Sequence, residues 1–182
     1  RILIAGKDIP EIQRRGLRDR IGIIQQAVVL FSGKISDNIT LWRGEGTVPN
    51  PLTVAERSRA ALEEMGFAKD LDLPLDERGA NLSMGERQIL AFARAVEKDP
   101  DVWILDEATA NVDSDTEIRF GQSLDRATRG KTLLMIAHRL ATIRKSDQII
   151  VLHKGTSSRK GITPPSCARE GTMRDSIAIK KR

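Results

Sequence analysis

Three short runs dominated by apolar residues occur in the second half of the chain, at residues 102–105, 132–136 and 149–152. Runs that are apolar on both faces are typical of buried strands in parallel sheets, where helices cover both faces. A helical pattern at about residues 116–126 separates the first two runs, which indicates a β-α-β crossover. We therefore expect an α/β fold with a parallel sheet in this half.

The first half of the chain has a different pattern. Residues 2–4, before a glycine, and residues 21–24 read as short strands. The stretch from residue 34 to about residue 96 is mainly helical in pattern, with strong loop signals at 44–46 and 49–51. No internal repeat is visible, so we expect one α/β domain with a largely helical insertion.

One helix of this insertion has a clear start signal. Ser83 is followed three residues later by Glu86, which is the spacing of a capping box, and apolar residues recur at helical spacing through residues 89–96. We therefore predict a helix that begins just after Ser83.

Composition narrows the class of protein. The 182 residues are 40% hydrophobic and 30% charged, as in an ordinary globular domain, and no apolar run is long enough to span a bilayer. One cysteine and two histidines exclude a disulfide framework and a Cys- or His-rich metal cluster. Arg1 is not followed by the apolar segment of a secretory signal, so we expect no leader there.

The net charge of +5 comes entirely from the C-terminal segment. Residues 156–182 hold seven basic and two acidic residues, which accounts for the whole surplus. The rest of the chain is neutral overall and has no basic face of its own, so we expect no nucleic-acid partner.

The residues best suited to chemistry follow the apolar runs. Asp106 and Glu107 end the first run, and His138 follows the second. Ligands of open α/β sheets bind outside the carboxyl ends of the strands. One carboxylate there can hold Mg²⁺ through water, and an adjacent one can orient an attacking water. The alternative is that both carboxylates are solvated strand-end residues.

Five separated motifs occur in the same order as in one known family. They are Gln26, Leu-Ser-Met-Gly-Glu-Arg-Gln at 82–88, Asp106-Glu107, Asp113 and His138-Arg139. With them, residues 1–155 resemble the nucleotide-binding domain of exporter-type ABC (ATP-binding cassette) transporters. Leu-Phe-Ser-Gly at 30–33 and Glu-Arg-Gly at 77–79 are also similar to the exporter type.

The resemblance implies a RecA-like P-loop NTPase core, incomplete at the N-terminus, with a helical signature subdomain at about residues 35–95. It also implies ATP and Mg²⁺ as cofactors. Gln26 and Asp106 would be the metal-binding residues, Glu107 would position the attacking water, and His138 would contact the γ-phosphate. In this interpretation Glu107 and His138 are catalytic.

The resemblance assigns the remaining site residues to the contact with a second cassette, in a homodimer or heterodimer. Ser83, Gly85 and Glu86 of the signature motif would bind the γ-phosphate of ATP held by the opposing cassette. Asp113 would lie at the dimer interface. The usual signature is Leu-Ser-Gly-Gly-Gln, so Met84 and Glu86 depart from it. Glu86 has an alternative function as the capping-box residue.

The implied activity is ATP hydrolysis that drives export of a substrate across the cell membrane. The partner would be a transmembrane domain in the same polypeptide, with the cassette on its cytoplasmic face. Two alternatives stay open: an inactive truncated remnant without ATPase activity, and a fragment of a soluble ABC ATPase.

The sequence contains no phosphate-binding P-loop of the form Gly-x-x-x-x-Gly-Lys-Ser/Thr. Its nearest match, residues 125–132, begins with Asp125, and a strand pattern follows where a helix is required. We therefore expect the chain to start just downstream of the P-loop and to bind ATP poorly alone.

Residues 156–182 do not continue the family pattern. Codons chosen for residues 155–161 and 175–182 give, after a one-base shift, His-Leu-Val-Glu-Lys-Gly and Leu-Tyr-Arg-Tyr-Gln-Glu-Ala, which are similar to the two ends of the family's tail. We therefore expect a frameshift at about residues 153–156, and the alternative is a disordered basic tail.

Overall fold

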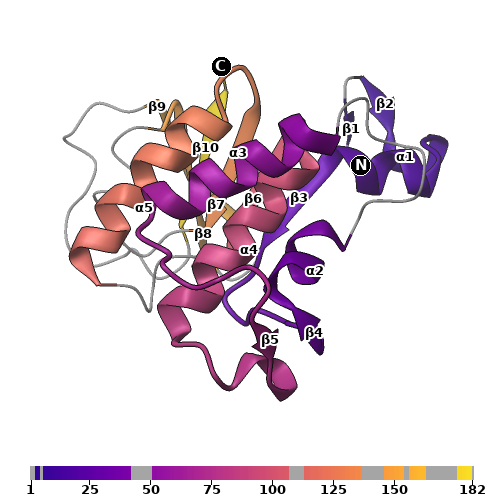
Figure 1. The fold of residues 1–182 in the computed structure, drawn as a ribbon. Coiled ribbons are helices and arrows are strands. Elements are labelled where there is room, and N and C mark those ends of the chain that lie inside the picture. Colours follow the sequence, from indigo (N-terminus) through magenta and orange to yellow (C-terminus); the bar gives the residue numbers. More distant parts are fainter. Residues whose placement is uncertain are drawn as a thin grey trace.

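The computed structural model of the chain describes residues 3–4, 6–41, 51–106, 113–136, 146–153, 156–162 and 176–181. A six-stranded sheet forms the centre of the fold, with helices packed against it (Figure 1). In spatial order its strands are β3 (Ile21–Ile24), β6 (Val102–Asp106), β7 (Thr132–Ile136), β10 (Ser176–Lys181), β8 (Gln148–His153) and β9 (Thr156–Ile162).

The parallel part of the sheet consists of β3, β6 and β7. Ile24 of β3 pairs with Leu105 of β6, and Asp106 of β6 pairs with Ile136 of β7. Helix α5 (Ser114–Ala127) lies between β6 and β7 in the sequence. The predicted β-α-β crossover is therefore confirmed, and so are the three predicted strands at residues 21–24, 102–105 and 132–136.

The other half of the sheet is antiparallel. β10 pairs antiparallel with both β7 and β8, and β9 pairs antiparallel with β8. The predicted run at 149–152 forms β8, which points the same way as β7 but is separated from it by β10. The sequence pattern did not indicate β9 and β10. For β10 the only signal is Ile177 and Ile179 at alternate positions, which is weak in six residues that end in two lysines.

Five helices and two small antiparallel ladders complete the described part of the chain. The helices are α1 (Arg14–Arg20), α2 (Ile35–Thr40), α3 (Pro51–Glu64), α4 (Met84–Lys98) and α5. Two 3-10 turns lie at Ile9–Glu11 and Glu77–Gly79. The ladders pair β1 (Leu3–Ile4) with β2 (Lys7–Asp8) and β4 (Gly33–Lys34) with β5 (Pro74–Leu75). Within the described residues, none of the helices has the length and apolar character needed to cross a membrane.

The predicted helical stretch at residues 34–96 is confirmed in outline, because α2, α3 and α4 lie in it. The structure adds the β4–β5 ladder, which was not predicted. In it Gly33 pairs with Leu75, and Lys34 pairs with Pro74. Asn38 of α2 is buried and holds the turn before the helix: its Oδ1 accepts from the Phe31 N–H at 2.8 Å, and its Nδ2 donates to the carbonyls of Phe31 and Lys34.

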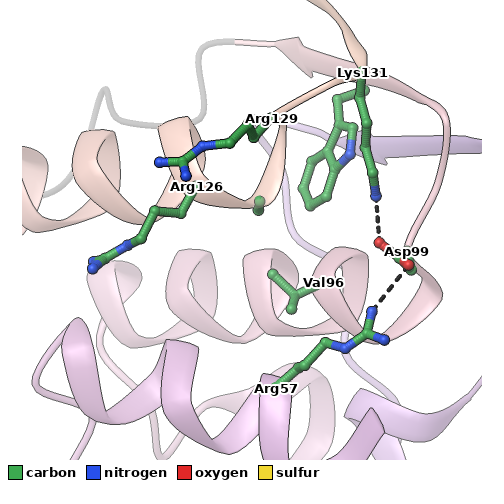
Figure 2. Close-up of a pocket in the computed structure, with 8 residues that line it drawn as sticks. Arg57, Val96, Asp99, Arg126, Arg129 and Lys131 are labelled. Atoms are coloured by element: carbon green, nitrogen blue, oxygen red, sulfur yellow. Dashed lines mark hydrogen bonds and ion pairs between the residues drawn. The ribbon is translucent and has the colours of Figure 1, made fainter. Parts of the chain in front are cut away.

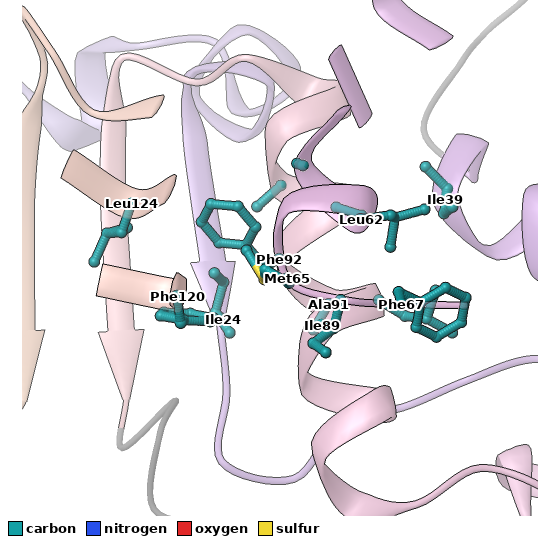
Figure 3. Packing of buried hydrophobic residues seen from close by; sticks show 14 of the residues in the cluster. Ile24, Ile39, Leu62, Met65, Phe67, Ile89, Ala91, Phe92, Phe120 and Leu124 are labelled. Atoms are coloured by element: carbon teal, nitrogen blue, oxygen red, sulfur yellow. The ribbon is translucent and has the colours of Figure 1, made fainter. Parts of the chain in front are cut away.

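Helix α4 is the centre of the hydrophobic core. Phe92 is 1% exposed, and its ring centroid lies 5.9 Å from that of Trp103 on β6 and 5.0 Å from that of Phe120 on α5. Figure 3 shows Phe92 among other buried members of this cluster, which include Ile24 of β3 and Met65 directly after α3. The core therefore joins the helical insertion and the sheet in one continuous cluster.

A polar contact also links the two long helices of the insertion. The hydroxyl of Ser58 on α3 donates to the carboxylate of Glu97 on α4, and both side chains are buried. Hydrogen bonding of this kind offsets the cost of removing polar groups from water. The pairing of α3 with α4 is thus specified by polar as well as apolar groups.

Candidate functional site

The carboxyl ends of β3, β6 and β7 form one edge of the sheet, and two of the predicted site residues lie there. Asp106 is the last residue of β6 and is half-buried. Gln26 follows β3 by two residues. Because Ile24 is in register with Leu105, the chain segments carrying Gln26 and Asp106 leave the sheet side by side. The prediction that Asp106 ends a parallel strand is confirmed.

Glu107 and His138 lie outside the described residues. They follow the last residues of β6 and β7 by one and two positions, and both strands end at the same edge as β3. Their catalytic functions therefore stay predictions.

The oxygen atoms available at this edge suit a magnesium ion. A carboxylate from Asp106 and an amide oxygen from Gln26 are hard ligands of the kind that Mg²⁺ prefers, and Mg²⁺ keeps several waters of its own. Among the described residues no cluster of three or more His, Cys, Asp or Glu side chains is placed to hold a metal. Asp106 and Gln26 would supply one or two protein ligands, and water and phosphate would complete the coordination of the ion.

The N-terminus of α4 carries the predicted signature residues Ser83, Gly85 and Glu86. The Glu86 N–H donates to Ser83 Oγ at 3.1 Å, and the Ser83 N–H donates to Glu86 Oε2 at 2.7 Å. The predicted capping box is confirmed. Ser83 and Met84 are exposed and Gly85 is half-exposed, so this helix end is accessible to a ligand. The partial positive charge of a helix N-terminus favours an anion such as phosphate.

The carboxylate of Glu86 contacts two other residues of the chain, Ser83 and Lys69. Partial burial raises its pKa. The hydrogen bonds from Ser83 and the ammonium group of Lys69, whose Nζ lies 3.5 Å from Glu86 Oε1, lower the pKa by more than burial raises it, so it lies below the usual value. Glu86 is therefore ionised at neutral pH. Because its negative charge is held by Ser83 and Lys69, it opposes a phosphate at the helix end less than a free carboxylate would.

The lowered pKa gives a test of the capping box. In Glu86→Gln the amide oxygen can still accept from Ser83, but the charge is lost. A group whose folded pKa is lowered stabilises the fold above its unfolded pKa, and this contribution disappears as the pH falls through the folded pKa. We expect wild type to be more stable than Glu86→Gln above the ordinary pKa of 4.5, and the difference to vanish in acid.

Urea unfolding of both proteins at pH 7 and at about pH 3 measures this difference. A Lys69→Gln background should reduce the pH dependence but not abolish it, because the Ser83 donors remain. A stability difference that is the same at both pH values would mean that Glu86 acts through packing and not through its charge.

Gln88 is a positioning residue that the sequence analysis did not single out. It is 1% exposed, and its Nε2 donates to the backbone carbonyl of Gln26 at 2.9 Å. This bond ties the first turns of α4 to the segment that leaves β3. Its sequence signals are its place at the end of the 82–88 motif and a polar side chain on the apolar face of an amphipathic helix.

Arg94 makes similar contacts further along α4. Its Nε donates to the carbonyl of Asn38 at 2.8 Å, and its Nη1 donates to the carbonyl of Val29 at 3.1 Å. Burial lowers the pKa of this guanidinium. Gln88 and Arg94 together hold the segment after β3 against α4 at two points.

Asp113 has a local structural function. It is exposed and caps α5, with its Oδ1 accepting from the Thr116 N–H at 2.9 Å. The hydrogen bonds from Thr116 lower the pKa of the Asp113 carboxyl. The capping explains this residue type at this position, and a contact of Asp113 with a second cassette stays a prediction.

The near-match to a P-loop at residues 125–132 is a different structure. Gly130 is in a turn with φ of 77°, Lys131 is ion-paired with Asp99, and Thr132 begins β7. A P-loop lysine must be followed by a helix whose N–H groups contact phosphate. The strand that follows instead confirms that this segment is not a phosphate-binding loop.

Known proteins are similar to this chain in both sequence and fold. A model of the ABC transporter family matches residues 1–110. The chain is 38% identical over 187 aligned positions to the probable multidrug resistance ABC transporter ATP-binding/permease protein YheH of Bacillus subtilis, covering 99% of this chain and 27% of that protein. It is 39% identical to the ATP-dependent lipid A-core flippase of Nitrosococcus oceani, covering 93% of this chain and 29% of that protein.

A solved structure agrees with these relatives. The structure of a bacterial Atm1-family ABC exporter with ATP bound superposes with a TM-score of 0.76 at 34% identity, covering 88% of this chain and 28% of that chain. The chain thus spans between a quarter and a third of the length of these three relatives. The matched family model, the identities and the shared α/β fold together show that this chain belongs to the ABC transporter family.

Proposed function

We propose that this chain is an ATP-binding and ATP-hydrolysing cassette of an ABC exporter, which couples hydrolysis at a cassette dimer interface to substrate export. The observation that carries the proposal is the Gln88–Gln26 hydrogen bond, which joins the segment that would hold this chain's own nucleotide to the helix that would contact the partner's nucleotide. It ties the accessible N-terminus of α4 to the edge of the sheet where Asp106 lies.

Each site residue has a distinct function in this proposal. Asp106 and Gln26 would hold Mg²⁺, which would supply positive charge to offset that of the ATP phosphates. Glu107 orients the attacking water, and His138 donates a hydrogen bond to the γ-phosphate oxygen on which charge develops. Because both follow strands that end at the Asp106 edge, the parallel sheet supports this grouping.

The signature residues act on the partner cassette. Ser83 and the exposed N–H groups of α4 bind the γ-phosphate of ATP carried by the opposing cassette, so two cassettes associate when ATP is present. Asp113 contacts the partner at this interface. The relatives that are named as ATP-binding/permease proteins support a transmembrane domain in the same polypeptide, which would place the cassette at the cytoplasmic face of the membrane.

The substitution Gly85→Asp tests this proposal. Gly85 is the second residue of α4, where an acidic side chain is favourable for the helix itself. The same charge repels a phosphate at the helix end. We expect ATP-dependent association of cassettes and ATP hydrolysis to fall about a hundredfold, with little loss of fold stability.

The matched control is Gly16→Asp in α1, where a new Cβ meets no atom within 4 Å. Light scattering with and without Mg-ATP, together with phosphate release, should show normal association and turnover for this control. The experiment uses a full-length protein that carries the cassette. Normal ATP-dependent association of Gly85→Asp would refute the assigned function of the α4 N-terminus.

A further inference from the structure

A pocket of about 270 Å³ opens where α3, α4 and α5 meet the beginning of β6 (Figure 2). The described residues that line it are Arg57, Val96, Asp99, Trp103, Arg126, Ala127, Arg129 and Lys131. Trp103 precedes Asp106 by three residues along β6, which corresponds to about 10 Å of extended strand. The pocket therefore lies at the amino ends of the strands, away from the candidate nucleotide site at their carboxyl ends.

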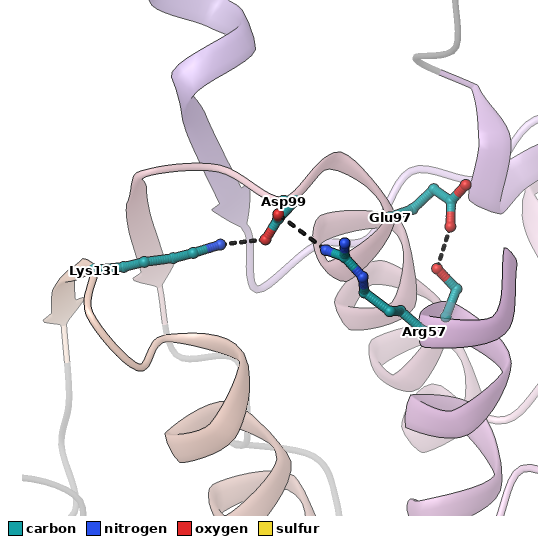
Figure 4. A network of polar contacts seen from close by, with 5 residues as sticks. Arg57, Glu97, Asp99 and Lys131 are labelled. Carbon is teal, nitrogen blue, oxygen red and sulfur yellow. Dashed lines mark hydrogen bonds and ion pairs between the residues drawn. The ribbon is translucent and has the colours of Figure 1, made fainter. Parts of the chain in front are cut away.

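The lining has an excess of positive charge, with four basic side chains and one carboxylate. Arg57 and Lys131 both pair with Asp99, Arg57 at 3.0 Å (Figure 4). Arg126 pairs with Glu64 outside the lining. The side chain of Arg129 makes no hydrogen bond or ion pair within the described part of the chain. The two carboxylates thus offset only two of the four cations.

Asp99 is held in an unusual position. It ends α4 in the left-handed region, with φ of 51°, where glycine or asparagine is the ordinary choice. Burial raises its pKa, but the hydrogen bonds and positive charges of Lys131 and Arg57 lower it by a larger amount, so the pKa lies below the usual range. The ionised Asp99 therefore holds Arg57 of α3 and Lys131, which directly precedes β7, at one side of the pocket.

Trp103 adds an unsatisfied donor to the same pocket. Its side chain is 1% exposed, and its Nε1 has no hydrogen-bond acceptor among the described residues. An indole N–H can only donate. Buried donors are almost always paired with an acceptor. Because this nitrogen has almost no exposed surface, the Trp103 indole serves as a reporter of changes in the pocket wall.

We propose that this pocket binds a phosphate group, either as inorganic phosphate or on a small phosphate monoester. Phosphate carries between one and two negative charges near pH 7, which complements the uncompensated cations. Its oxygens can accept from the guanidinium of Arg129, which has no partner within the described part of the chain. Val96 and Ala127 supply an apolar wall against which the body of a monoester can pack.

The Trp103 indole N–H gives a direct measurement. The chain has two tryptophans, so ¹⁵N-labelled protein gives two indole N–H signals, and Trp42→Phe identifies the signal of Trp103. Titration with inorganic phosphate at constant ionic strength should move this signal in a saturable way. We expect Arg126→Gln/Arg129→Gln to weaken the apparent affinity about tenfold or more.

The matched control is Arg15→Gln/Arg59→Gln, which removes the same charge from two exposed positions outside the pocket and should leave the affinity unchanged. Arg129→Gln alone breaks none of the ion pairs described here and should weaken binding about threefold. Phenyl phosphate is the second probe: tighter binding than phosphate would identify a monoester, and equal binding would identify free phosphate.

Three results would overturn the proposal. They are an indole signal that does not move, a signal that chloride moves equally at the same ionic strength, and a phosphate response that is the same in the Arg126→Gln/Arg129→Gln variant. The readout does not depend on ATP hydrolysis, so this test is independent of the proposed nucleotide site.

Discussion

Glu107→Gln is expected to lower the rate of ATP hydrolysis about a thousandfold while ATP remains bound. Glutamine has the shape of glutamate but cannot accept a proton from water or polarise it as a carboxylate does. Glu107 follows Asp106 directly in the sequence, and Asp106 ends a central parallel strand at the edge where Gln26 also leaves the sheet. The effect should therefore fall on turnover and not on nucleotide binding.

Phosphate release and equilibrium ATP binding, measured on a full-length protein that carries the cassette, separate these two effects. ATP-bound dimers of Glu107→Gln should accumulate, because hydrolysis no longer separates them. Glu63→Gln on the exposed face of α3 is a control that makes the same chemical change elsewhere, and it should hydrolyse ATP normally. Turnover within a few-fold of wild type would remove Glu107 from its catalytic function.

Phe92→Ala should cause the largest loss of stability among the substitutions considered, about 4 kcal/mol in the free energy of unfolding. The ring is fully enclosed between Trp103 and Phe120, so its removal loses buried apolar contacts and leaves a cavity. Because α4 joins the sheet to the helical insertion, this loss should affect both parts in one unfolding transition.

Phe31→Ala is the matched control. The Phe31 side chain is 53% exposed, and its bonds to Asn38 use only backbone atoms, so the loss should stay within about 0.5 kcal/mol. Phe92→Leu fills part of the space and should cost about 1.5 kcal/mol. Urea unfolding monitored by circular dichroism gives all three values. Equal losses for Phe92→Ala and Phe31→Ala would contradict the central position of Phe92.

The sequence predicted the elements whose signals lie within a few consecutive residues. The runs at 102–105 and 132–136 consist mainly of apolar residues, and they form β6 and β7, in which buried residues alternate with half-buried ones. Ser83 and Glu86 satisfy each other's backbone N–H groups across three residues, so the start of α4 could be predicted as well. The order of five motifs was enough to indicate the family.

The tertiary structure alone decided which distant segments meet. Gln88 contacts Gln26 across 62 positions, and Arg94 contacts Val29 across 65. The strand order that places β10 between β7 and β8, and the convergence of Arg57, Asp99 and Lys131, are equally non-local. Local patterns report burial and backbone preference, whereas these contacts depend on how buried faces pack together, and packing joins residues whose separation in the sequence carries no signal.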